Sequence, residues 1–374
     1  MGAFSLSNLK EDLAALDKLL FGSIALLCLL GIACIFSAGY SFSGRGWAYA
    51  TRQIGWLAIA IVACVMMMAI GYEKLMDLAY PIYGVTLLLL LMTFLVSPEV
   101  KGAQRLIPLG FIRFQPSEFA KISLIIVLSK FLSRYPPLSF KSFLGGVCVG
   151  LPALFLVLIQ PDAGSGMVYI VITLSMLFVA GPPLKYLYSA AVLGVALLPF
   201  AWLFLKDYQK MRLLVFIDPT RDPLGAGYNA IQSRIAVGSG SLWGKGFLQG
   251  LQSKLRFLPE PHTDFIFSVY AEEFGFWGAF LLLVIFGLVF ARIIAAGMKS
   301  RDIRGKIITA GVAGWIWFQM FEGIGMCIGL MPITGIPLPF LSYGGSSLLS
   351  VFIALGLVGS VYAGSAKRYK PGRI

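Results

Sequence analysis

The sequence has few of the residues from which soluble enzymes build their sites. It has one histidine, His262, in 374 residues, which excludes a metal site built on several histidines. Its cysteines lie in apolar stretches without C-x-x-C spacing, so we expect neither disulfides nor a cysteine zinc site (Cys28, Cys34, Cys64, Cys148 and Cys327). Only 13% of the residues are charged, whereas 58% are hydrophobic. This composition indicates an integral membrane protein.

Long apolar runs take the place of charge. A helix needs about 20 apolar residues to cross a bilayer core, and we find segments of about that length at 19–38, 54–71, 79–97, 118–133, 143–160, 166–181, 186–205, 265–295, 307–328 and 346–364. We predict an all-α integral membrane fold, a polytopic bundle of about ten transmembrane helices that forms a single domain over residues 1–374. Between the seventh and eighth spans we expect a large structured extracytoplasmic loop, residues 206–264. Because no small-residue cleavage site follows the first span, we do not expect a removable signal peptide.

The basic residues predict how the chain is oriented. Lys and Arg gather in the C-terminal tail and in the loops 130–141 and 296–306, so the positive-inside rule places both termini in the cytoplasm. Residues 206–264 then lie outside although they carry eight Lys or Arg and five acidic residues. This loop is either a tolerated solvated segment or an ordered basic surface for an anionic ligand such as phosphate. Its seven glycines and short apolar runs favour the second interpretation.

Charged residues inside apolar spans are costly and are candidates for function. Glu118 and Lys121 are spaced i, i+3 and share a helix face, so they form either a self-neutralising pair or a ligand contact. Asp162 lies in a Gly-rich break between two spans, where it serves as a helix cap or as part of a site. Of the neighbours Glu272 and Glu273, we expect one to orient an adjacent helix.

Glu322 precedes the Gly/Pro-rich segment 323–345, which is not expected to form an ordinary helix. We predict a re-entrant or loop structure that lines a cavity there.

The run FLPEPHTDFIF, residues 257–267, places Asp264 where a polar loop enters an apolar span. Burial favours the neutral carboxyl and nearby cations favour the charged one, so Asp264 is a candidate general base near neutral pH. His262 and Glu260 would be shaping residues or hydrogen-bond partners in the site. The alternative is that Asp264, after Thr263, is the N-cap of the eighth span.

Several stretches resemble the SEDS family of peptidoglycan polymerases, namely GAQRLIPLGFIRFQPSEFAKI, QPDAGSG, DYQKMRLLVFIDPTRDPLGAGY, FLPEPHTDFIFSVYAEEFG and GLMPITGIPLPFLSYGGSS. The sequences of these motifs are more similar to those of the elongation members than to those of the division members. The resemblance implies a multi-pass glycosyltransferase of the bacterial inner membrane that polymerises lipid II, the undecaprenyl diphosphate-linked disaccharide peptide, on the outer side. It also implies that Asp264 takes the proton of the acceptor 4-hydroxyl while the anomeric carbon of the donor is inverted.

The developing diphosphate charge needs cations. We select Arg212 first, because it occupies a place in the family's DYQ-x-x-R motif. The full set of predicted substrate-binding residues is Arg105, Glu118, Lys121, Asp162, Arg212, Lys245, Arg256, Glu260 and His262. No cofactor is predicted. A divalent cation, Mg or Mn, is allowed but has only Asp264 and Glu260 as visible ligands.

The resemblance also implies partners, which are a class B penicillin-binding transpeptidase, other proteins of the elongation complex and membrane lipids, with no nucleic acid. Two other functions remain open from sequence. A lipid II flippase or transporter shares the broken helices and buried charges, but we find no internal repeat. A non-catalytic scaffold is the third interpretation.

Three places depart from the family pattern. Leu106 replaces a tryptophan, QPDAGSG differs from the usual QPDLGTS, and Gly323 replaces an asparagine. We expect the neighbouring Glu322 to compensate for the asparagine.

Overall fold

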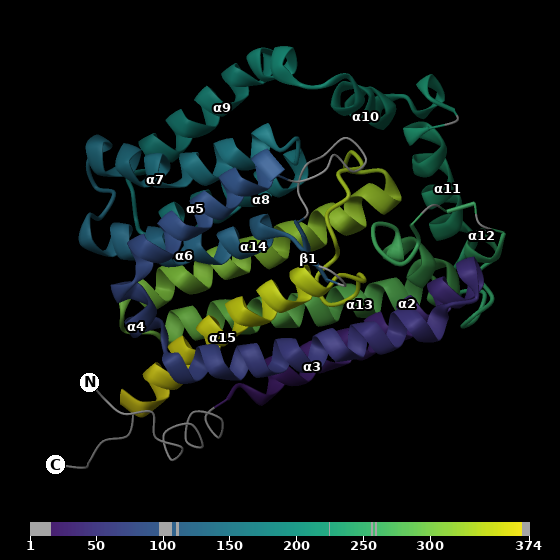
Figure 1. Ribbon diagram of the computed structural model, residues 1–374, viewed down its shortest axis with the longest axis horizontal. Coiled ribbons are helices and arrows are strands. Elements are labelled where there is room, and N and C mark those ends of the chain that lie inside the picture. Colours follow the sequence, from purple (N-terminus) through teal and green to yellow (C-terminus); the bar gives the residue numbers. More distant parts are fainter. Residues whose placement is uncertain are drawn as a thin grey trace.

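The computed structural model describes residues 16–96, 107–109, 112–223, 225–255, 257–258 and 260–368 as a bundle of long helices (Figure 1). Its long helices are α2 (Lys18–Ser43), α3 (Gly46–Ile70), α5 (Ala79–Val96), α6 (Pro116–Arg134), α7 (Phe140–Ile159), α8 (Ala163–Val179), α9 (Leu184–Phe204), α13 (Ile266–Lys299), α14 (Ile303–Ile328) and α15 (Gly345–Arg368). Each coincides with a predicted span, which confirms the helical membrane fold. Seven are long and apolar enough to cross a membrane: α2, α3, α5, α7, α13, α14 and α15. The number of ten crossings stays a prediction.

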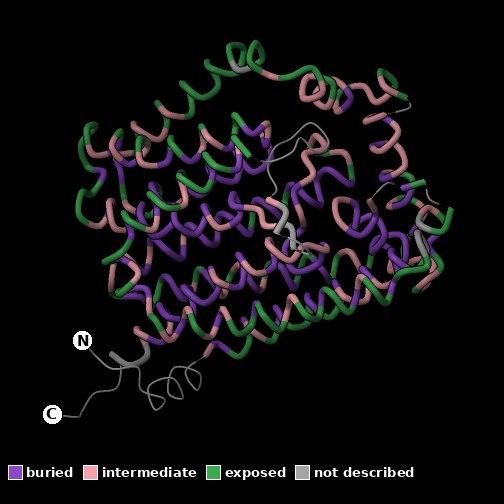
Figure 2. Tube along the Cα trace, viewed as in Figure 1, coloured by how far each residue is buried: buried purple, intermediate pink, exposed green. Residues whose placement is uncertain are grey.

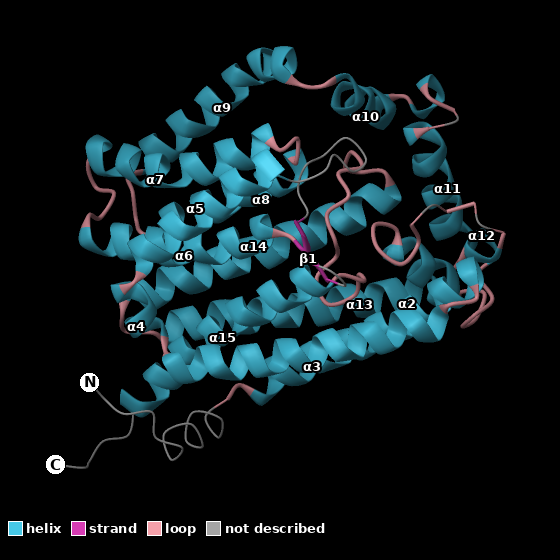
Figure 3. Ribbon diagram, in the orientation of Figure 1, coloured by secondary structure: helices cyan, strands magenta, loops and turns pink. Residues whose placement is uncertain are grey.

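Shorter elements connect these helices. They are α4 (Tyr72–Asp77), α10 (Asp207–Ile217), the 3-10 helix η1 (Pro219–Arg221), α11 (Ala226–Ser239) and α12 (Leu251–Lys254). Strands β1 (Ile107–Leu109) and β2 (Ile112–Phe114) form a small antiparallel hairpin, drawn in magenta in Figure 3, that the sequence did not indicate. The helices between residues 206 and 264 agree with a structured loop.

The two C-terminal helices form the centre of the bundle. In the most apolar window of α14, and likewise of α15, 78% of the residues are buried, compared with 22% for α3. Figure 2 shows the same gradient, with buried segments inside and exposed ones along the outer helices. Helix α9 is exposed over most of its length and stands apart at the top of the view. The outer apolar faces are therefore the ones that suit contact with lipid.

The bundle has two distinct ends (Figure 1). Helices α10, α11 and α12 lie at one end, where α11 packs on α13 and α14. The start of α2 and the end of α15 lie at the opposite end, near α4. Asp17, the N-cap of α2, accepts a hydrogen bond of 2.8 Å from Arg292 of α13 there. The first and last long helices thus begin and end on one side, as an even number of crossings requires.

Helix α13 is broken at Gly275, whose φ of 66° and ψ of −163° lie outside the helical region. The break removes the usual helical acceptors of the next two amides. Instead, the Phe276 N–H donates to the Ser241 carbonyl at 2.9 Å and the Trp277 N–H donates to the Leu242 carbonyl at 3.3 Å. The segment after α11 therefore supplies acceptors that the helix has lost.

The same segment also satisfies the carbonyls that the break sets free. The Glu272 carbonyl accepts from the Lys245 N–H and the Glu273 carbonyl accepts from the Gly246 N–H, each at 3.0 Å. Because backbone groups inside a membrane protein must find partners within the protein, this pairing fixes the loop against the kink.

We expect Gly275→Ala to destabilise the protein. An added Cβ would lie 2.3 Å from the Gly244 nitrogen, and alanine is strained at this positive φ. The free energy of unfolding should fall by about 2–3 kcal/mol, seen as a lower unfolding temperature of the purified protein.

The matched control is Gly287→Ala in the same helix, where an added Cβ meets no atom within 4 Å. That change should leave stability unaltered or raise it by up to about 1 kcal/mol. Equal unfolding temperatures for the two variants would contradict the role of the kink.

Candidate active site

Asp264 lies half-buried in the turn that leads into α13. The N-cap of that helix is Phe265, without a capping side-chain hydrogen bond, so the alternative that Asp264 is the N-cap is wrong. Its carboxylate lies against Gly335, because a Cβ added there would be 3.2 Å from Asp264 Oδ2. Gly335 also has a φ of +75°, which glycine adopts without strain. A larger residue at this position would crowd the carboxylate.

Gly335 belongs to the irregular segment 329–344 that joins α14 to α15. This confirms the predicted loop, whereas the prediction that it lines a cavity stays untested. The predicted start of the irregular segment is wrong, because Gly323 and Gly325 lie within α14, which continues to Ile328. Each glycine costs a helix about 1 kcal/mol, and packing of the buried helix outweighs that cost.

Glu322 connects this loop to the opposite side of the site. Its side chain is buried in α14, and its Oε1 accepts a hydrogen bond from the Thr334 hydroxyl. Arg212 of α10 donates to the Thr334 carbonyl at 3.3 Å. Glu322 interacts electrostatically with both Asp264 and Arg212. Residues from three separate parts of the chain therefore lie near Glu322, namely Arg212, Asp264 and Thr334.

Glu322 was absent from the predicted site residues. The signal that points to it is a carboxylate within an apolar span, immediately before a Gly-rich segment. Its proximity to Asp264 arises only because α14 and the start of α13 pack together.

The start of α8 borders the same loop. Asp162 is the N-cap of α8 and accepts from the Ser165 N–H at 3.2 Å and from its hydroxyl at 2.8 Å. Gly164 lies so close to Thr334 that an added Cβ would be 3.0 Å from the Thr334 Cβ. The predicted helix cap at Asp162 is confirmed, and its contact with substrate stays a prediction.

A hydrogen-bond network supports the residue before Asp264. The Ser342 hydroxyl donates to the Thr263 carbonyl at 2.7 Å and accepts from the Leu338 N–H at 2.9 Å. The buried side chain of Gln53 in α3 donates to the Ser342 carbonyl and accepts from the Gly344 N–H, both at 3.3 Å. Helix α3 and the loop are thereby tied to the turn that carries Asp264.

His262 is a packed residue of the same turn. Its ring stacks on Tyr49 at a centroid distance of 4.5 Å and meets Tyr343 edge-on at 5.7 Å. Its carbonyl accepts from the Tyr343 N–H at 2.9 Å. Glu260 is partly exposed, two residues earlier. The substrate contacts predicted for both residues stay predictions.

Glu118 and Lys121 form a buried ion pair of 2.7 Å in α6. The second Glu118 oxygen accepts from the Ser350 hydroxyl at 3.0 Å, and the Lys121 ammonium lies 4.6 Å from the centre of the Trp315 ring. The pair thus joins α6 to α14 and α15. These contacts favour the self-neutralising interpretation.

Glu272 and Glu273 hold the loop and a neighbouring helix. Glu272 accepts from the Lys245 ammonium at 2.7 Å, and Glu273 accepts from the Ser37 hydroxyl of α2. The expectation that one of them orients an adjacent helix is confirmed by Glu273. Glu272 follows Asp264 by eight residues, which corresponds to roughly 12 Å along the axis of a helix. Lys245, which pairs with Glu272, is therefore held at about that distance from Asp264.

Arg105 and Arg256 lie outside the described residues. Within the described ranges, no group of three or more His, Cys, Asp and Glu side chains is placed to hold a metal ion. A divalent cation thus stays allowed but not predicted, as it was from the sequence.

The chain is similar to known proteins over almost its whole length. The family model FtsW/RodA/SpoVE, described as cell cycle protein, matches residues 17–367. The peptidoglycan glycosyltransferase MrdB of Escherichia coli K12 is 38% identical over 351 residues, which cover 92% of this chain and 94% of MrdB.

Two solved structures have the same fold. A chain in a structure on the coordination of polymerization and crosslinking by a peptidoglycan synthase complex matches with a TM-score of 0.80 at 32% identity, covering 95% of this chain and 98% of that one. The rod shape determining protein RodA of Thermus thermophilus matches with a TM-score of 0.71 at 30% identity, with the same coverage.

We expect Glu118→Ala to be strongly destabilising, because it leaves the Lys121 ammonium buried without its partner. The cost should be about 3–5 kcal/mol, measured as a lower unfolding temperature. The double change Glu118→Leu with Lys121→Met removes both charges and should restore most of that stability.

The double variant also separates structure from chemistry. If it regains the unfolding temperature and the activity of the unchanged protein, the pair is structural. A stable but inactive double variant would contradict this interpretation and return both residues to the substrate site.

Proposed function

The chain belongs to the FtsW/RodA/SpoVE family of cell cycle proteins, and from this premise we propose how it acts as a peptidoglycan glycosyltransferase. It polymerises lipid II into glycan strands at the outer face of the bacterial cytoplasmic membrane, for elongation and rod shape. The observation that carries this proposal is the position of the Asp264 carboxylate against Gly335, with Glu322 close to both Asp264 and Arg212.

Asp264 is the general base of the reaction. Its carboxylate takes the proton of the acceptor 4-hydroxyl as the oxygen bonds to the anomeric carbon of the donor. The bond between that carbon and the diphosphate breaks, the carbon is inverted, and undecaprenyl diphosphate leaves with its electron pair. The room that Gly335 leaves beside the carboxylate supports this role.

Arg212 stabilises the charge that develops on the leaving diphosphate. A guanidinium is suited to this task because its planar donors match phosphate oxygens. Its hydrogen bond to the Thr334 carbonyl and its interaction with Glu322 hold it near Asp264. We assign Glu322 the role of positioning this guanidinium. Lys245 serves the loop structure through Glu272.

The chain works with a transpeptidase that cross-links the strand as it is made. The support is the similar chain in a peptidoglycan synthase complex whose study concerns both polymerization and crosslinking. Both termini face the cytoplasm, because the loops at the same end of the bundle are rich in Lys and Arg and such loops lie on the cytoplasmic side. The end that carries Asp264 then faces outward, where the cross-linking reaction takes place.

The rival function is transport of lipid II. The similarity to a named glycosyltransferase over most of both chains favours polymerisation. A transporter would move lipid II without changing its mass, whereas a polymerase lengthens the glycan.

The first experiment is polymerisation of labelled lipid II by the purified full chain together with its cognate transpeptidase. Asp264→Asn keeps the size of the side chain and removes the base, so product should fall by at least about 100-fold. Products are sized on a gel, and binding of the transpeptidase is measured in parallel.

Each outcome separates the three functions. A ladder with the unchanged protein alone supports polymerisation by Asp264. A full ladder with Asp264→Asn would refute the role of Asp264. No ladder with either protein, despite transport of labelled lipid II across vesicles, would establish the flippase instead.

We expect Arg212→Ala to slow polymerisation by roughly 10- to 100-fold, because a charge-assisted contact with the diphosphate is lost. The control is Arg221→Ala, since Arg221 lies in the same loop and, among the described residues, pairs with Asp218 at 3.5 Å. Initial rates are measured against lipid II concentration. Equal rates for the two variants would remove Arg212 from the site.

A further inference from the structure

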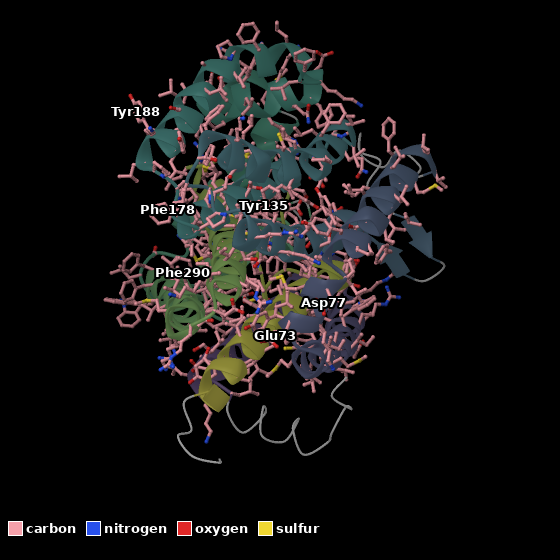
Figure 4. All side chains as sticks on the ribbon, turned by 90° about the vertical axis from the view of Figure 1, so that its left-hand side faces the viewer. Glu73, Asp77, Tyr135, Phe178, Tyr188 and Phe290 are labelled. Atoms are coloured by element: carbon pink, nitrogen blue, oxygen red, sulfur yellow. The ribbon has the colours of Figure 1, made fainter. Side chains whose placement is uncertain are left out.

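A polar pocket lies at the opposite end of the bundle from Asp264. It opens where α13 ends at Lys299 and α14 begins at Ile303, and Tyr72 of α4 and the last turns of α15 complete its wall. Its volume is about 50 Å³, enough for more than one water-sized group. Figure 4 looks onto this end of the molecule, with Glu73 of α4 labelled. Nothing in the glycosyl transfer reaction uses this pocket.

The acidic residue in the pocket is already neutralised. Asp302 caps α14 and accepts from the Arg304 N–H at 3.0 Å, and its Oδ2 pairs with the Arg304 guanidinium at 2.8 Å. The Tyr72 hydroxyl donates to the same oxygen at 3.1 Å. Burial opposes ionisation of Asp302, but the hydrogen bonds from Arg304 prevail and lower its pKa.

Tyr72 stays a donor. Burial, followed by the charge of Asp302, raises the pKa of Tyr72 to about 12. Asp302 therefore pairs with Arg304 and accepts a hydrogen bond from Tyr72. Glu73, the next residue of α4, also acts on Tyr72 and Arg304 through its charge.

Two cations of the pocket have no acidic partner among the described residues. Lys299 and Arg301 line the pocket from the turn between α13 and α14. Within the described part of the chain, neither forms an ion pair. The Lys299 ammonium lies 5.3 Å from the centre of the Tyr362 ring, which holds it without neutralising it. The pocket thus presents two cations that have no ion-pair partner in the described part of the chain, while its hydroxyl groups already donate within the protein.

Apolar side chains flank these cations on the outside. Met298 and Ile303 are 77% and 43% exposed, at the ends of two helices that are apolar enough to cross a membrane. This places the pocket at the boundary between hydrocarbon and water, where a phosphate would meet the cations while acyl chains lie along the apolar flanks.

We propose that Lys299 and Arg301 form a binding site for the phosphate of an anionic phospholipid headgroup, at the end of the bundle opposite Asp264. A free phosphate ion shares the headgroup chemistry but has no use for the apolar flanks. The proposal does not rest on glycosyl transfer, because the site is remote from that chemistry.

The test measures lipid retained by the purified full chain, using native mass spectrometry after exchange into phosphatidylglycerol or phosphatidylcholine. The unchanged protein should retain phosphatidylglycerol in preference. The double variant Lys299→Gln with Arg301→Gln should bind it at least about ten-fold more weakly, because two charge-assisted contacts are lost. The control variant is Lys130→Gln with Arg134→Gln, which removes the same charge near the same end, from cations that already contact Tyr80 and Tyr135.

The outcomes distinguish a defined site from a general positive field. Loss of phosphatidylglycerol in the Lys299/Arg301 variant, with retention in the control, supports the proposal. Equal loss in both double variants would overturn it, because only the total charge would then matter. Displacement of phosphatidylglycerol by millimolar inorganic phosphate would also overturn it, because the ligand would then be the free ion. The unfolding temperatures of both double variants are measured as well, to verify that each variant is folded.

Discussion

Polar groups buried inside this bundle are shielded from bulk water, and the arrangement of the helices depends on how the protein satisfies them. Glu118 and Lys121 pair within α6 and reach α14 and α15 through Trp315 and Ser350. Each contact costs desolvation, which is recovered only when the packing is correct. The buried pair therefore links α6 to both α14 and α15.

The break in α13 connects this constraint to the chemistry. A helix that stops at Gly275 exposes donors and acceptors, and residues 241–246 satisfy them. This holds the segment that follows α11 against α13, so that α10 and α11 remain next to the turn of Asp264. Arg212, on α10, reaches Thr334 in consequence. The basic loop is thus a folded part of the protein that lies beside the candidate site.

The two ends of the bundle have different chemical characters. One end carries Asp264, Glu322 and Arg212 around a glycine-rich loop, where the carboxylate is held near a cation. The other carries Lys299 and Arg301 beside a small polar pocket and exposed apolar residues. Anionic lipid chemistry is involved at both ends in the functions proposed here, as substrate at one and as a bound headgroup at the other.

The sequence by itself determined the helical membrane fold and the family, because apolar runs and ordered motifs are local properties of the chain. It also selected Asp264 as the candidate base. It also indicated the cap at Asp162 from a Gly-rich break. Tertiary structure favoured the self-neutralising alternative for Glu118, because Ser350 and Trp315, which contact the Glu118–Lys121 pair, come from distant helices. It brought Glu322 to the site and turned Lys245 toward Glu272. A side chain's charge is visible in sequence, but its partner depends on how helices pack in three dimensions.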